Sequence, residues 1–298
     1  MQTPFDPDSS AAYLRWRDHK LAHATTRTEE LIVEINDPRA LTAAEHGALL
    51  DRCRHNDMAI YTTGGDPADE DMVRRFGLQF GLASLDANWL AGEQGITRVT
   101  VCADDGQRQA YIPYTDRAIK WHTDGYYNPP ERQIRGMIMH CVHSAGQGGE
   151  NRLLDHEIAY LLLRDENTDF IRALSAPDAM TIPERTDEYG VARAAQTGPV
   201  FSVDPASGQL HMRYTARTRS IAWKQDSVTL AAVAALEKLL ASDLPHIHRI
   251  RLEPGMGLLC NNVLHDRAAF VDDGNAPRLM FRARYLERIA DTPFKPQR

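Results

Sequence analysis

The sequence has few cysteines, and they are far apart. There are four, at Cys53, Cys102, Cys141 and Cys260, and no two form a C-x-x-C pair. This spacing suits neither a disulfide framework nor a structural zinc site. Within residues 1–96 we also expect no cluster of histidine and cysteine that could bind zinc.

Signals for a membrane or for nucleic acid are missing as well. The N-terminus lacks a basic start and an apolar run, so no signal peptide is expected. No segment approaches the roughly 20 apolar residues that cross a bilayer. The formal charge of −7 argues against a general nucleic-acid binder, which needs a basic face. We therefore expect a cytoplasmic protein with a small-molecule substrate and neither nucleic acid nor a membrane as partner. A homo-oligomer stays open.

What is present is a mixture of helical and extended patterns that changes character near residue 97. Helical periodicity predicts helices over 11–24, 41–54, 69–81 and 227–242. Short apolar runs between Pro, Gly, Asp and Asn predict strands at 30–35, 59–63, 97–103, 134–143, 151–155, 179–183, 199–204, 210–214, 248–253, 257–262 and 278–286.

Many short strands separated by turns favour a sandwich or barrel. We predict a mainly β fold with flanking helices, a double-stranded β-helix (jelly roll). Residues 1–298 are expected to form one domain, in which 1–96 packs on the core and 97–298 carries the metal and cosubstrate site.

The segment Trp121-His-Thr-Asp-Gly125 contains an H-x-D motif. On a strand, residues two apart point to the same side, so His122 and Asp124 can present an imidazole and a carboxylate at one point. A second histidine would complete the facial triad of non-haem Fe(II) oxygenases, which leaves three coordination positions open. The motif also occurs at His55-Asn-Asp57, but nothing downstream completes that copy, so we do not expect it to be the site.

Downstream residues supply the missing parts. His265 lies in Cys260-Asn-Asn-Val-Leu-His265, and Arg278 follows it in a strand that alternates apolar and basic residues. Arg278, Arg282 and Arg284 share one face of that strand. A guanidinium beside a metal pocket would clamp the far end of a dicarboxylate. A solvated edge strand is the alternative interpretation.

These elements, taken in order, resemble the taurine dioxygenase family of Fe(II)/2-oxoglutarate oxygenases, which includes γ-butyrobetaine hydroxylase. The resemblance covers residues 121–285. It rests on His-Thr-Asp, the Gly-Gly-Glu-Asn turn at 148–151, the Asn-Val-Leu-His-Asp-Arg stretch at 262–267 and the arginine strand. Tyr127 and the Met-His-Cys run at 139–141 resemble the γ-butyrobetaine hydroxylase branch.

The resemblance implies the following roles. The iron ligands would be His122, Asp124 and His265, the 2-oxoglutarate contacts Asn151 and Arg278, and the contact for an anionic substrate group Arg282. No catalytic residue beyond the metal ligands is implied. Fe(II), 2-oxoglutarate as cosubstrate and O₂ would hydroxylate an unactivated C–H bond of a small polar metabolite that carries an anionic group, with release of succinate and CO₂. Desaturation or bond cleavage after hydroxylation stays open.

Three further residues are weaker candidates for substrate contacts. Tyr126 and Tyr127 follow the metal motif, where ordinary packing explains them equally well. Arg213 lies in a basic loop region that solvation also explains. Two other functions are kept as alternatives: a zinc-dependent metallohydrolase using the same three ligands, and a non-catalytic sensor of 2-oxoglutarate or another small molecule on the same scaffold.

Overall fold

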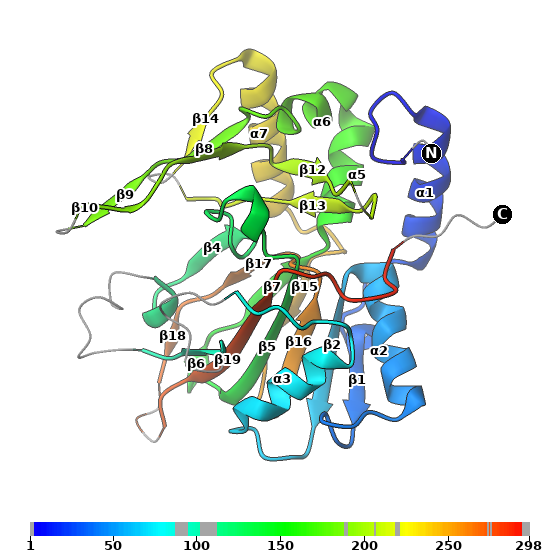
Figure 1. Cartoon of the computed structure of the whole chain (residues 1–298). Helices are drawn as coiled ribbons and strands as arrows, with labels where there is room; N and C mark the ends of the chain where they lie inside the picture. Colours follow the sequence, from blue (N-terminus) through cyan, green and yellow to red (C-terminus); the bar gives the residue numbers. More distant parts are fainter. Residues whose placement is uncertain are drawn as a thin grey trace.

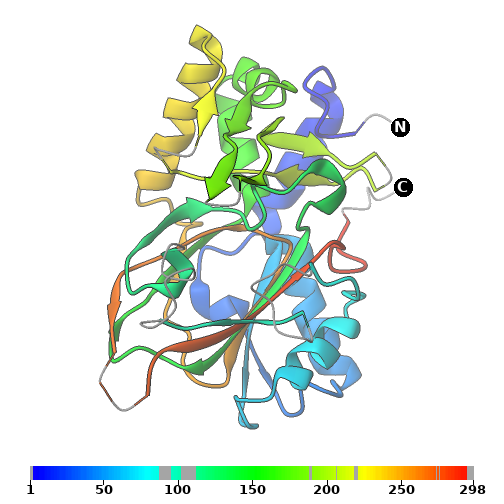
Figure 2. The same cartoon turned by 60° about the vertical axis from the view of Figure 1, so that its left-hand side comes forward.

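The computed structural model describes residues 3–86, 95–101, 112–187, 190–205, 207–217, 221–272, 274 and 276–293. Its helices gather mainly at one end of the β-sheets, while two of them lie along the sheets (Figures 1 and 2). The α-helices are α1 (Ser10–His23), α2 (Ala43–Asn56), α3 (Glu70–Leu78), α5 (His156–Glu166), α6 (Thr168–Leu174) and α7 (Ser227–Ala241). Short 3-10 helices are η1 (Thr28–Leu31), η2 (Ile112–Tyr114) and η3 (Pro130–Arg132). None of the helices in the described part of the chain is long and apolar enough to span a membrane.

Two larger sheets dominate the fold. The six-stranded sheet has the order β1 (Ile32–Ile35), β2 (Met58–Thr63), β16 (Met256–Cys260), β5 (Gly136–His143), β19 (Leu279–Tyr285), β3 (Thr97–Val99). The four-stranded sheet has the order β15 (His248–Ile250), β7 (Asn151–Leu154), β17 (Leu264–Arg267), β4 (Ile119–His122). Only the β1–β2 pair is parallel among these neighbours.

Smaller pairings complete the described strands. They are β6 (Gln147–Gly148) with β18 (Phe270–Val271), β9 (Arg185–Asp187) with β10 (Gly190–Arg193), β12 (Phe201–Val203) with β13 (Leu210–Met212), and β8 (Met180–Ile182) between β11 (Gln196–Gly198) and β14 (Ala222–Trp223). The mainly β character with flanking helices is as predicted. The end of the predicted strand 97–103 lies outside the described residues.

The alternation of side chains along the strands divides the core into two layers. On β16, Leu258 and Cys260 pack with Leu153 of the four-stranded sheet, whereas Leu259 packs on the opposite face with Phe76 of α3. Successive residues of a strand point to opposite sides, so one strand feeds both layers. Helices α2 and α3 thus cover the outer face of the six-stranded sheet, and the inner face looks toward the four-stranded sheet.

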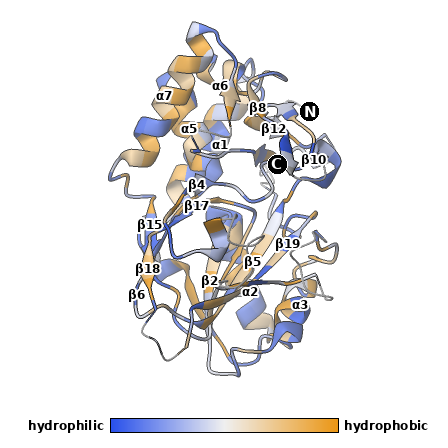
Figure 3. Cartoon of the chain, turned by 90° about the vertical axis from the view of Figure 1, so that its left-hand side faces the viewer, coloured by the Kyte–Doolittle hydropathy of each residue, from blue (hydrophilic) through white to orange (hydrophobic). Residues whose placement is uncertain are grey.

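A third apolar cluster joins α1, α5, α6 and α7 at the end of the sheets, and hydrophobic residues run along α7 in Figure 3. After residue 97 the sequence patterns predict only one helix, so α5 and α6 correct that prediction. The apolar run 158–163 has no clear helical period and also fits a buried strand. The missed signals were the N-caps: the Asp155 carboxylate accepts the Glu157 backbone N–H, and the Asn167 side chain accepts that of Asp169.

Candidate active site

The three predicted iron ligands meet beside the paired strands β4 and β17. These strands are antiparallel neighbours, and His265 is the register partner of His122. Their ring centroids lie 4.2 Å apart. The Oδ1 atom of Asp124 is 3.7 Å from Nε2 of His122. One ligand atom from each of the three buried side chains lies within 4.8 Å of the others, so a single ion can contact all three.

Asp124 reaches this point from a turn and not from a strand, which corrects the expectation that one strand carries both residues. Strand β4 ends at His122, and the turn continues through Gly125 at a φ of +68°. The side chain of Asn262 holds this turn. Its Oδ1 accepts the Asp124 backbone N–H at 2.8 Å, and its Nδ2 donates to the carbonyls of Asp124 at 2.9 Å and Ile134 at 2.7 Å.

Local hydrogen bonds turn both imidazoles toward the common point. Nδ1 of His122 lies 2.9 Å from the Lys120 carbonyl, and Nδ1 of His265 lies 2.9 Å from the Val263 carbonyl. Because a carbonyl only accepts, each Nδ1 carries the proton, and each Nε2 keeps a lone pair for a metal. Burial, with the neighbouring His265, lowers the pKa of His122 to about 3, so its imidazole is neutral near pH 7.

The carboxylate is ionised and has room for a ligand. Burial alone would raise the pKa of Asp124, but the guanidinium groups of Arg282 and Arg284 hold it well below its usual range. Oδ2 of Asp124 is buried without a hydrogen-bond partner among the described residues. A buried, unpartnered anionic oxygen beside two imidazole lone pairs fits a divalent cation, and two His with one carboxylate is the donor set that Fe(II) takes in facial-triad oxygenases.

A pocket next to the triad is lined by both sheets. His122, His265 and Asn151 lie on the four-stranded side, and Met280, Arg282 and the adjoining Arg278 lie on the β19 side. The pocket therefore brings the two candidate histidine ligands together with arginine side chains, among them Arg278 and Arg282.

Arg278 and Asn151 have the character expected of cosubstrate contacts. Arg278 is buried, which lowers its pKa, and no carboxylate forms an ion pair with its guanidinium within the part of the chain that the structure describes. Its Nε lies 3.6 Å from the Cβ that a side chain at Gly149 would carry, so this glycine leaves room beside it. Nδ2 of Asn151 donates to the Asp266 carbonyl at 2.7 Å, while its buried Oδ1 has no partner among the described residues.

The other two arginine positions differ in their surroundings. Nη1 of Arg282 is 3.3 Å from Oδ1 of Asp124, so this cation faces the metal site. Arg284 is already engaged, because it donates to the Asp86 carboxylate at 2.6 Å and to the Tyr127 hydroxyl at 2.9 Å. Of the three arginines predicted to share one face of the strand, Arg284 is therefore structural, whereas Arg278 and Arg282 lie at the pocket.

The weaker substrate candidates, Tyr126, Tyr127 and Arg213, also differ in their surroundings. Tyr126 is buried with its ring edge-on to His122, at 6.5 Å between centroids, and it packs against Tyr127 at 5.1 Å. Arg213 instead gives its donors to backbone carbonyls, among them those of Met180 at 2.7 Å and Gly198 at 3.0 Å. It does not line the pocket at the triad.

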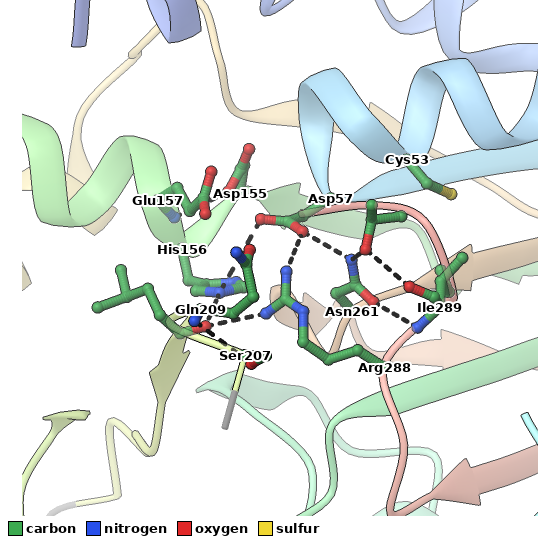
Figure 4. A network of polar contacts seen from close by, with 12 residues as sticks. Cys53, Asp57, Asp155, His156, Glu157, Ser207, Gln209, Asn261, Arg288 and Ile289 are labelled. Carbon is green, nitrogen blue, oxygen red and sulfur yellow. Dashed lines mark hydrogen bonds and ion pairs between the residues drawn. The ribbon is translucent and has the colours of Figure 1, made fainter. Parts of the chain in front are cut away.

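The two residues of the second H-x-D copy line one cavity but belong to two different clusters of possible metal ligands. Asp57 ends α2 in the left-handed conformation and accepts hydrogen bonds from Asn261 and Arg288 at 2.7 Å each. It belongs to a buried polar network with His156 and its neighbours (Figure 4). His55 lies next to two histidines of α1, His19 and His23.

Comparison with known proteins gives the family. The model of the taurine catabolism dioxygenase TauD, TfdA family matches residues 18–284. The chain belongs to this family. It is a 2-oxoglutarate-dependent non-haem iron oxygenase that uses Fe(II), 2-oxoglutarate and O₂ to hydroxylate a small-molecule substrate, with release of succinate and CO₂. The family assignment favours this function over the metallohydrolase and sensor alternatives.

Individual relatives are distant. A uridine-5′-phosphate dioxygenase from Streptomyces sp is 26% identical over 222 residues, which are 73% of this chain and 78% of the relative. Asparagine oxygenase, solved with Fe(II), 2S,3S-3-hydroxyasparagine and succinate, has a TM-score of 0.59 at 13% identity over 94% of this chain and 85% of that one. The non-haem iron oxygenase OrfP, solved with Fe, succinate and (3S)-hydroxy-L-Arg, has a TM-score of 0.59 at 15% identity over 82% and 80%. The shared fold is the predicted double-stranded β-helix.

Proposed function

We propose that His122, Asp124 and His265 bind the iron of this oxygenase and that Arg278 and Asn151 hold 2-oxoglutarate. The observation that carries the proposal is one pocket lined by the two histidines of the triad and by the buried guanidinium of Arg278, which has no ion pair among the described residues. A dicarboxylate at the metal needs a cation at its far end, and a guanidinium fork suits a carboxylate. The unpartnered Oδ1 of Asn151 is a further polar contact beside the same space.

The chain itself orients and shields the reactants. When bound, Fe(II) and 2-oxoglutarate would supply the electrons that activate O₂, and O₂ would be the oxidant. The Nδ1 contacts of His122 and His265 fix the ring orientation, and Asn262 fixes the turn of Asp124. Burial of all three ligands keeps bulk water away from the site.

The substrate is proposed to be a small polar metabolite with an anionic group, held by Arg282 and bordered by Tyr126 and Tyr127. Arg282 faces the triad and has no ion pair other than that with Asp124 among the described residues. The named relatives act on or bind uridine 5′-phosphate, asparagine and arginine derivatives, all of which carry a phosphate or a carboxylate. Arg213 is left out, because its donors bind backbone carbonyls.

Three broader expectations stay predictions. The whole chain, 1–298, is proposed to form one oxygenase domain, with β1 and β2 of the N-terminal part extending the six-stranded sheet. A cytoplasmic location and a homo-oligomer are likewise left to experiment.

The test is a screen that follows succinate release with Fe(II), 2-oxoglutarate and O₂ across amino acids, nucleoside monophosphates and quaternary-ammonium acids. We expect release above the substrate-free rate with at least one anionic compound, and a rate at background in His265→Ala. Binding of 2-oxoglutarate without turnover across the whole panel would favour the sensor. Tight Zn²⁺ binding with hydrolysis would favour the metallohydrolase.

A further inference from the structure

Three histidines outside the active site come together where α1 meets α2. His19 and His23 lie one turn apart on α1, and His55 lies in the last turn of α2. One ring nitrogen from each lies within 4.8 Å of the other two. The ring centroids of His19 and His23 are 4.2 Å apart, and those of His23 and His55 are 4.9 Å apart. The expectation that residues 1–96 hold no such cluster was wrong, because folding brings His55 to the pair on α1.

In His23 and His55, one ring nitrogen contacts an acceptor and the other can act as a ligand. Nδ1 of His23 lies 2.8 Å from the His19 carbonyl, so it carries the proton and Nε2 keeps its lone pair. Nδ1 of His55 lies 3.7 Å from Oδ2 of Asp51, one turn earlier on α2. A carbonyl or a carboxylate behind the second ring nitrogen is the usual support of a metal-binding histidine.

The surroundings also suit a cation. Both α1 and α2 end at this cluster, and the C-terminal end of a helix carries partial negative charge. Lys20 is close, but its ammonium is neutralised by Asp155 at 2.6 Å and Glu157 at 2.7 Å.

We propose that His19, His23 and His55 form a second metal site for a divalent transition-metal ion of the class that prefers imidazole, with Zn²⁺ as the representative. The side chains are partly exposed, so water can complete the coordination. The ion would tie α1 to α2. Since α1 packs Trp16 against Tyr160 of α5, and α2 covers the six-stranded sheet, this link joins the helical end of the fold to the sheet.

The first test separates this site from the iron site. In an untagged His122→Ala/His265→Ala variant, isothermal titration with Zn²⁺ is expected to show one bound ion per chain. Adding His23→Asn should weaken that binding at least about tenfold, which corresponds to roughly 1.4 kcal/mol. His46→Asn is the matched control, because His46 lies on α2 but stacks on Phe80, and it should leave Zn²⁺ binding unchanged.

Stability gives a second measurement that does not depend on activity. Saturating Zn²⁺ should raise the melting temperature of the double variant and should no longer do so after His23→Asn. If the double variant is poorly folded, the same titration is done on the wild-type chain. The wild type should bind two Zn²⁺ ions and His23→Asn only one. Turnover of 2-oxoglutarate with Fe(II) should be the same in both. The proposal would be overturned if Zn²⁺ binding stayed unchanged in His23→Asn and His55→Asn. It would also be overturned if the wild type bound a single Zn²⁺ ion and both variants still bound it.

Discussion

His122 and His265 occupy the same register position on the neighbouring strands β4 and β17, and their rings lie 4.2 Å apart. The β-ladder therefore fixes two of the three candidate iron ligands relative to each other. Asn262, just before β17, fixes the third by holding the turn of Asp124. Arg278 lies directly before β19 of the other sheet, so residues from both sides of the fold contribute to the site.

Asn262 should be required for both stability and iron binding. Its φ of 53° suits glycine, so Asn262→Gly removes the amide without adding backbone strain. The change leaves buried backbone groups unpaired, and we expect a loss of about 2–4 kcal/mol in the free energy of unfolding and a roughly tenfold weaker Fe(II) affinity. Urea unfolding and anaerobic Fe(II) titration measure the two effects. Asn36→Ala, at an exposed asparagine, is the control, and an equal loss there would contradict the assignment.

Arg278→Lys keeps the positive charge but removes the planar guanidinium, which can donate two parallel hydrogen bonds to a carboxylate. We expect the KM for 2-oxoglutarate to rise about 10- to 100-fold, since a hydrogen bond to a charged group contributes roughly 1.5–3 kcal/mol. Succinate formation at varied 2-oxoglutarate measures it. Arg249→Lys is the matched change at an exposed arginine that pairs with Asp243. A KM for 2-oxoglutarate that stays at the wild-type value in Arg278→Lys would remove this residue from the cosubstrate site.

Arg282 and Arg284 should respond differently to the same substitution. Arg282→Met is expected to keep 2-oxoglutarate binding but to lose most of the substrate-stimulated succinate release, because the substrate's anionic group loses its cation. Arg284→Met removes one of the two guanidinium partners of the buried Asp86 and leaves Arg132 as the other, so the free energy of unfolding should fall by about 1–3 kcal/mol. Succinate release at saturating Fe(II) and urea unfolding are measured for both variants. The reverse pattern would argue against Arg282 as a substrate contact.

The buried network of Figure 4 should make stability depend on pH. Burial, helped by the charge of Asp57, raises the pKa of Asp155 to about 6 even beside Lys20. Between about pH 4 and 6 the folded chain then binds a proton that the unfolded chain has lost, so this group's contribution to stability falls as pH rises. In Asp155→Asn, the free energy of unfolding should therefore decrease by up to about 3 kcal/mol less than in the wild type over this pH range. Urea unfolding from pH 4 to 7 measures the difference between wild type and variant, and parallel pH curves would contradict the account.

The sequence predicted the parts of the site that depend on short spacing and order. The H-x-D motif, the distal His265 and the later Arg278 could be found because each motif is compact and their order resembles a family. The same patterns could not reveal that Asp124 sits in a turn, since its position depends on Asn262, far along the chain.

Other features depended on long-range packing. Arg213 could not be excluded from the site by sequence, because its acceptors are carbonyls from separate segments such as those at Met180 and Gly198. The helix α5 was missed because a buried helix and a buried strand share the same apolar run. The histidine cluster of α1 and α2 required the two helices to pack.

The most direct test of the central claim is an anaerobic titration of the iron-loaded protein with 2-oxoglutarate. Chelation of Fe(II) by the keto acid gives a visible charge-transfer band, which we expect in the wild type and in Arg249→Lys. The band should disappear in His265→Ala and weaken strongly in Arg278→Ala. No band in the wild type, or a band that both variants keep at wild-type 2-oxoglutarate concentrations, would contradict the assignment of His122, Asp124, His265 and Arg278.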